Sequence, residues 1–84
     1  MSVDRVIFRT WRDRPETVIA ILPDQEASPG LMMMYEHVGQ HGEGDYYHVL
    51  GHTRPSLLAE YADLLLELRS IGYNPRLYRR IFRR

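Results

Sequence analysis

The sequence contains no cysteine. This absence excludes disulfide bonds, thiolate catalysis and cysteine-rich zinc sites, and it is typical of cytoplasmic proteins. No apolar run approaches the roughly 18 residues that a membrane span needs, and no apolar signal segment follows Met1. The sequence therefore predicts a cytoplasmic protein that does not insert into a membrane.

Lysine is also absent, so all eleven basic residues are arginine. Eleven acidic residues bring the formal net charge to zero, but the charges are unevenly placed. Residues 1–70 contain six arginines and all eleven acids, which gives −5, and residues 71–84 contain five arginines and no acid, which gives +5. An acidic body thus carries a basic end, and arginine binds carboxylate and phosphate groups through paired hydrogen bonds.

The length of 84 residues is that of one domain, and a hydrophobic share of 44% is close to that of globular proteins. We expect a single α+β domain over 1–84 with an Arg-rich C-terminal end over 76–84. Because a chain of this size has a thin core, a homodimer formed through an edge strand is compatible with the sequence.

Runs of β-branched, aromatic and other apolar residues predict three strands in the first half of the chain, at 3–12, 17–22 and 31–38. Turn residues separate them, with Pro15 in the first connection and a loop at 23–30 in the second. The second strand is apolar on both faces, which indicates a central strand that is covered on both sides. The first two strands should form an antiparallel hairpin.

Residues 39–44 contain three glycines, which predicts a loop, and residues 45–53 fit either a short strand or a helical turn. A helix is clear after Pro55, with Thr53 or Ser56 as its expected N-cap and Gly72 at its end. Its apolar stripe comprises Leu57, Tyr61, Leu64, Leu65, Leu68 and Ile71.

A last strand is predicted at 73–82, and Pro75 confines it to an edge because proline lacks a backbone N–H. The predicted fold is therefore α+β: an antiparallel β-meander of three strands, one amphipathic helix packed on it, and a C-terminal edge strand.

All four histidines lie between residues 37 and 52, in a stretch that is also rich in glycine, tyrosine and acidic residues. Loops on a rigid scaffold commonly carry function, so we expect this stretch to bind a partner, and a protein is the favoured one. The expected contact residues are His37, Gln40, His41, Asp45, Tyr46 and Tyr47.

A metal site is the alternative for part of the same stretch. His37, His41 and Asp45 are candidate ligands, or the centre of a metal- or nucleotide-dependent enzyme, although their spacing matches no closed zinc pattern. No serine is well placed as a nucleophile. The sequence thus favours a binding protein without a cofactor over an enzyme.

The basic end offers a second surface, which comprises Arg76, Arg79, Arg80, Arg83 and Arg84. Tyr78 and Phe82 lie between these arginines, and such a mixture suits the phosphates and bases of nucleic acid. A solvated tail, or a tail paired with the acidic body, explains the same pattern. Nucleic-acid binding through this end is therefore an alternative to protein binding.

A longer pattern spans nearly the whole chain: Val6-Ile7-Phe8-Arg9, Ile19-Ala20-Ile21-Leu22-Pro23, Tyr35-Glu36-His37-Val38-Gly39-Gln40-His41-Gly42, Asp45-Tyr46, Thr53, Glu60-Tyr61 and Ile71-Gly72-Tyr73. It resembles a family of small proteins encoded by phages, plasmids and integrated elements of bacteria. The run from His37 to His41, followed by Asp45-Tyr46, is its specific part. The resemblance implies the genomic context of a phage or mobile element. Together with the small size and the lack of a convincing catalytic set, it favours an accessory protein that binds a host or element macromolecule, and the modulation of a defence system is one such role.

Overall fold

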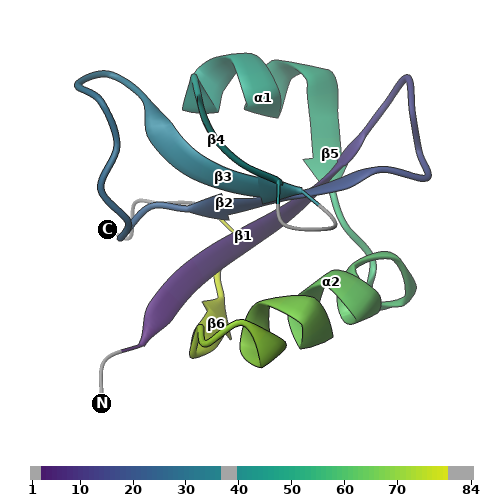
Figure 1. Ribbon diagram of the computed structural model, residues 1–84. Coiled ribbons are helices and arrows are strands. Elements are labelled where there is room, and N and C mark those ends of the chain that lie inside the picture. Colours follow the sequence, from purple (N-terminus) through teal and green to yellow (C-terminus); the bar gives the residue numbers. More distant parts are fainter. Residues whose placement is uncertain (1–2, 37–39, 80–84) are drawn as a thin grey trace.

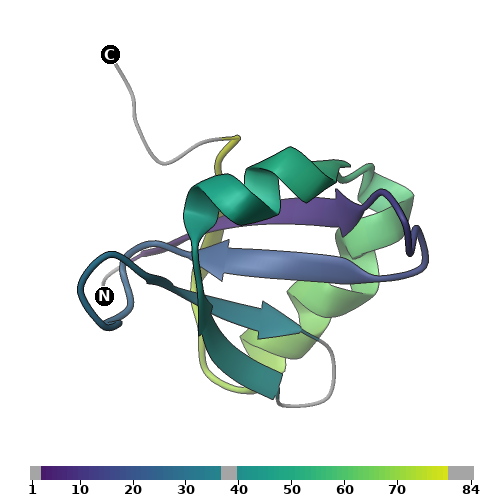
Figure 2. The same ribbon diagram turned by 90° about the horizontal axis from the view of Figure 1, so that it is seen from above.

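The computed structural model of the protein describes residues 3–36 and 40–79. Its elements are β1 (Asp4–Trp11), β2 (Val18–Leu22), β3 (Met32–Glu36), β4 (Gln40–Gly44), α1 (Tyr46–His52), β5 (Thr53–Pro55), α2 (Leu58–Ser70) and β6 (Pro75–Leu77). One helix lies on each face of the sheet (Figure 1, Figure 2). Neither of these helices is long and apolar enough to cross a membrane.

The strands follow the order β4-β3-β2-β1-β5, and β6 also pairs with β1. β1, β2 and β3 lie where the sequence predicts strands. They pair antiparallel, with Ile7 opposite Ile21 and Ala20 opposite Tyr35. The α+β class is therefore confirmed, but the sheet has six strands instead of a three-stranded meander with one edge strand, and a second helix is present.

Residues 40–44 form a strand, so the prediction of a loop there is wrong. β4 pairs antiparallel with β3 and places Gly42 opposite Met34. A Cβ atom built on Gly44 would lie 2.8 Å from Sδ of Met34, so a side chain at this position would displace the methionine. Glycine at position 44 avoids this displacement, and the glycines of this stretch give it the composition of a loop.

Residues 46–52 form the helix α1, which resolves the choice between a strand and a helical turn. Thr53 was an expected N-cap of the later helix, but it follows the C-terminus of α1 and begins β5. Leu57 occupies the N-cap position of α2, so neither Thr53 nor Ser56 caps that helix.

β6 is much shorter than the predicted strand at 73–82, part of which lies outside the described residues. It runs parallel to β1, with Leu77 opposite Val6. The carbonyl of Val6 accepts a hydrogen bond from the backbone N–H of Tyr78 at 2.8 Å, and the carbonyl of Phe8 accepts one from Ser56 at 3.2 Å. Because alternate residues of a strand direct their backbone groups to the same edge, β5 and β6 share one edge of β1.

The sheet is buried on both faces along β1 and β2. The core on the α2 side contains Val6, Phe8, Ala20, Leu22, Tyr35, Leu64 and Leu68, and the core on the α1 side contains Ile7, Ile19, Ile21, Met34, Tyr46 and Val49. The prediction of a central second strand with two covered faces is confirmed. The predicted helical stripe is too long, because Leu57 is 66% exposed and Ile71 is 49% exposed.

A polar network joins β5 and α2 to β1. Glu60 accepts two hydrogen bonds from the guanidinium of Arg54, at 2.8 and 2.5 Å. It also accepts the hydroxyl of buried Thr10 at 3.1 Å and the backbone N–H of Leu57 at 2.8 Å. These hydrogen bonds, that of Arg54 above all, lower the pKa of Glu60 to about 2. The fold therefore stabilises the charged carboxylate.

We expect Leu68→Ala to destabilise the protein strongly. The Leu68 side chain is fully buried at 0% exposure, so its truncation should lower the free energy of unfolding by about 2–5 kcal/mol. Urea unfolding followed by circular dichroism measures this change. Leu66→Ala is the matched control on the same helix, because Leu66 is 61% exposed, and it should change stability by less than about 0.5 kcal/mol. Equal losses in the two variants would contradict the assigned buried face of α2.

The stability of the protein should fall in acid partly through Glu60. Its pKa in the folded state lies below the ordinary 4.5, so its contribution is present above that pH and is lost as the pH falls through about 2. Glu60→Gln should therefore flatten the dependence of unfolding free energy on pH across this window. Urea unfolding at about pH 5 and about pH 3 tests it, and a Glu60→Gln variant with the wild-type dependence would contradict this role of Glu60.

Candidate binding site at the edge of the sheet

β4 is the last strand of the sheet on one side (Figure 2). It pairs with β3, and among residues 3–36 and 40–79 no other strand pairs with it. His41, Gly42 and Glu43 in the middle of β4 are exposed. The edge of a sheet presents backbone N–H and C=O groups that can pair with a further strand.

A pocket of about 350 Å³ lies on the face of β4 that is turned toward α1. Its apolar lining comes from Ile19, Met34 and Val49. Gly42 and Gly44 line it from β4, and a Cβ atom added at Gly42 would have no neighbour within 4 Å. The open space above β4 therefore exists because this strand carries glycine there.

Charged groups and an indole ring form the polar part of the same pocket. The indole N–H of Trp11 donates a hydrogen bond to Oε2 of Glu36 at 2.9 Å. The guanidinium of Arg14 lies over the Trp11 ring, 5.0 Å from the centroid, and is 3.8 Å from the carboxylate of Asp13. The Trp11 ring is thus held in a defined orientation beside an apolar surface.

A second pocket, of about 430 Å³, touches β4 at His41 and is otherwise lined by Ile71, Gly72 and Tyr73. His41 is paired with Tyr35, whose ring belongs to the core on the α2 side. Nε2 of His41 is 3.0 Å from the hydroxyl of Tyr73, and the His41 and Tyr35 rings meet edge-on with centroids 4.6 Å apart. Burial raises the pKa of the Tyr73 hydroxyl above its ordinary value.

The structure separates the predicted contact residues. His41 is exposed in β4, and Tyr47 is 68% exposed at the start of α1. Tyr46 is only 6% exposed and packs in the core on the α1 side, so its role is in the fold and not at the surface. Gln40 begins β4, and His37 lies outside the described residues.

Asp45 is the N-cap of α1. Its carboxylate accepts hydrogen bonds from the backbone N–H groups of Tyr47 at 3.0 Å and His48 at 3.4 Å. The described residues contain no group of three or more potential metal ligands, and the proposed set includes His37, which lies outside them. His48 and His52 lie one turn apart on α1, with ring centroids 4.3 Å apart. Among the described residues they have no third potential metal ligand beside them.

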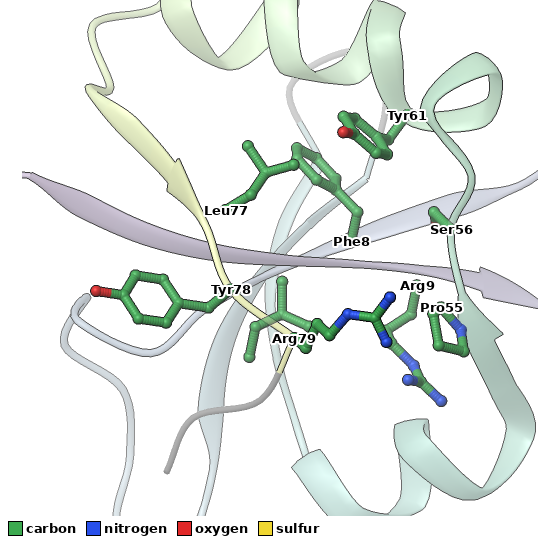
Figure 3. Close-up of a pocket in the computed structure, with 9 residues that line it drawn as sticks. Phe8, Arg9, Pro55, Ser56, Tyr61, Leu77, Tyr78 and Arg79 are labelled. Atoms are coloured by element: carbon green, nitrogen blue, oxygen red, sulfur yellow. The ribbon is translucent and has the colours of Figure 1, made fainter. Parts of the chain in front are cut away.

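Two arginines of the basic end, Arg76 and Arg79, are among the described residues, and they do not line the same surface. Arg76 is exposed in β6, and Arg79 lines a pocket with Arg9 at the opposite edge of the sheet (Figure 3). Arg80, Arg83 and Arg84 lie outside the described residues.

Several residues around these pockets escaped the sequence prediction. Trp11 and Tyr73 lie far from β4 in the sequence, and the pairing of strands brings them beside it. A tryptophan at the end of a strand, followed by a charged turn, was the available signal for Trp11. Ile71 was assigned to the helical stripe, and its exposure of 49% shows that it is a surface residue.

Comparison of the chain with protein-family models, curated proteins and solved structures gives no match. The functional interpretation therefore depends on the geometry of the sheet edge and its pockets.

Asp45→Ala should lower the free energy of unfolding by about 1 kcal/mol, because two backbone N–H groups at the start of α1 lose their acceptor. Asp45→Asn should retain most of the stability, since asparagine is an equally good N-cap. Urea unfolding of the two variants measures the difference. Equal destabilisation by both substitutions would contradict the capping role.

Proposed function

We propose that the protein is a non-enzymatic binding protein that takes up an extended segment of a partner protein as an added strand along β4. This proposal is based on the position of the outer edge of β4, with which no other described strand pairs, between two pockets, one on each face of the sheet. Successive side chains of a strand point to opposite faces. An added strand would therefore direct alternate side chains toward the two pockets.

In strand addition, the backbone and the side chains of the added segment are recognised by different parts of the binding protein. Main-chain hydrogen bonds to β4 would supply affinity for any extended segment, and the two pockets would select its side chains. The apolar lining by Ile19, Met34 and Val49 favours an aliphatic or aromatic side chain on the α1 side. Ile71 and the ring of Tyr73 favour an apolar side chain on the α2 side.

The charges at this edge favour a basic segment. Glu36 and Glu43 both line the pocket on the α1 side; Glu36 accepts the indole N–H of Trp11, and Glu43 accepts the backbone N–H of Ser28 at 2.9 Å. Arg14 also lines this pocket and lies beside Asp13, so carboxylates outnumber guanidinium groups here. The segment that fits best therefore combines alternating apolar residues with lysine or arginine.

The polar contacts near β4 support binding over catalysis. Glu36 accepts the indole N–H of Trp11, His41 contacts the hydroxyl of Tyr73, and Asp45 caps α1. Within the described part of the chain, these hydrogen bonds join no nucleophile to a general base. A partner from a bacterial host or from a mobile element agrees with the resemblance noted in the sequence, and a component of a defence system is one such partner.

Gly42→Gln should block the pocket on the α1 side without unfolding the protein, because a Cβ atom at Gly42 meets nothing within 4 Å. A peptide selected from a random display library against the wild-type protein serves as the probe, and fluorescence anisotropy measures its affinity. We expect Gly42→Gln to weaken binding by about tenfold or more. Gly51→Gln, on the exposed side of α1, is the matched control and should bind as the wild type does.

The other face has its own pair of variants in the same assay. Ile71→Glu places a charge at the pocket on the α2 side, whereas Leu66→Glu makes the same change at a residue of α2 that lines neither pocket. Only Ile71→Glu should weaken the peptide. Selected peptides that bind Gly42→Gln and Ile71→Glu as tightly as the wild type, or that shift amide resonances away from 40–44, would overturn the proposal.

A further inference from the structure

The opposite edge of the sheet contains a pocket that strand addition at β4 does not use. β6 pairs with β1 at Asp4–Val6 and β5 pairs with it at Arg9–Trp11, so Ile7 and Phe8 lie between the two short strands. A pocket of about 260 Å³ opens at this interruption (Figure 3). It is a consequence of two short strands sharing one edge of β1.

One side of this pocket is apolar. The rings of Phe8 and Tyr61 are stacked, with centroids 4.7 Å apart and planes within 3° of parallel. Leu77 from β6 is 42% exposed next to them. Figure 3 shows these three side chains on the side of β1 that faces α2. This wall offers a flat apolar surface to a bound group.

The other side is basic. Figure 3 shows Arg9 and Arg79 on the side of β1 that faces α1, with the Arg79 side chain extending from the end of β6 toward Arg9 and Pro55. Arg9 is held in place, since its guanidinium donates to the hydroxyl of Thr53 at 3.0 Å and to the carbonyl of Thr53 at 2.9 Å. Two guanidinium groups from different strands therefore line one small pocket.

The charge of these arginines is not neutralised by the described residues. Arg9 is half-buried, whereas Arg79 is exposed. The other half-buried arginines of the body, Arg5 and Arg54, pair with Asp24 and Glu60. No carboxylate in 3–36 or 40–79 forms an ion pair with Arg9 or Arg79. Burial lowers the pKa of Arg9 and neighbouring Arg12 lowers it further, yet a guanidinium stays charged in proteins. A partly buried cation without a counter-ion favours an anionic ligand.

We infer that this pocket binds a phosphate ester that carries an aromatic group, the chemistry of a nucleotide, either free or within a single-stranded nucleic acid. The phosphate would lie between Arg9 and Arg79, and the attached ring would contact Tyr61 and Leu77. Two guanidinium groups that approach from different strands suit the several oxygens of a phosphate, whereas one guanidinium already satisfies a carboxylate. The volume, about 260 Å³, lies just below the ~300 Å³ at the lower end of small-molecule sites, so the pocket is suited to a small ligand or to one unit of a longer one.

The test uses a short fluorescein-labelled oligothymidylate and the full chain, with anisotropy measured over a series of salt concentrations. Arg79→Gln should weaken binding by about tenfold and reduce the slope of log affinity against log salt by about 0.7, the value for one phosphate contact on a single strand. Arg76→Gln is the matched control, because Arg76 is exposed three positions earlier and does not line the pocket. Its affinity should stay within about twofold of the wild type.

Competition by adenosine monophosphate separates the two sources of the phosphate. Displacement at concentrations similar to those of the oligonucleotide would identify a free nucleotide as sufficient, and displacement only at far higher concentrations would assign the site to a strand. Equal losses for Arg76→Gln and Arg79→Gln would overturn the inference in favour of non-specific attraction to the basic end. The absence of any oligonucleotide or nucleotide binding by the wild type at low salt would overturn it outright.

Discussion

The burial of β1 and β2 on both faces is the constraint on which the rest of the structure depends. Phe8 and Leu22 point into the core covered by α2, while Ile7 and Ile21 point into the core covered by α1. A sheet with two apolar faces requires a layer on each side, and in a chain this short each layer is a single helix. The chain must therefore cross from α1 to the other face through β5, and it returns to β1 as β6. This path leaves β4 at one edge and two short strands at the other.

Periodicity predicts the parts of the fold that bury the most apolar surface. The three early strands and α2 were placed within a few residues, because their side chains alternate or repeat over many positions. β4 was predicted as a loop because glycines such as Gly42 and Gly44 are typical of loops, whereas in the structure Gly44 lies directly against the Met34 side chain. β5 and β6 have three residues each, too few for a period to be visible, and their pairing with β1 alone makes them strands.

The candidate sites were less predictable than the fold. The clustered histidine, tyrosine and acidic residues lie in and next to β4 at one edge of the sheet, yet Tyr46 is a core residue and Asp45 is a helix cap. Residues of these types are typical of a binding loop, but here one packs in the core and the other caps a helix. Arg9 and Arg79 are 70 positions apart, and only the parallel pairing of β6 with β1 brings them to one pocket. Their common position at one pocket follows from the register of the strands, which the amino-acid sequence alone does not reveal.

The two edges of the sheet differ in charge, and this difference limits what each can bind. Glu36 and Glu43 lie beside β4, whereas Arg9 and Arg79 line the interruption between β5 and β6. These charges would disfavour an anionic ligand at the first edge and favour one at the second, and a basic segment would have the reverse preference. The two pockets on these edges share no lining residue, so substitutions at one should act independently of those at the other. A variant that impairs both kinds of binding has therefore disturbed the common strand, β1, or the cores on its two faces.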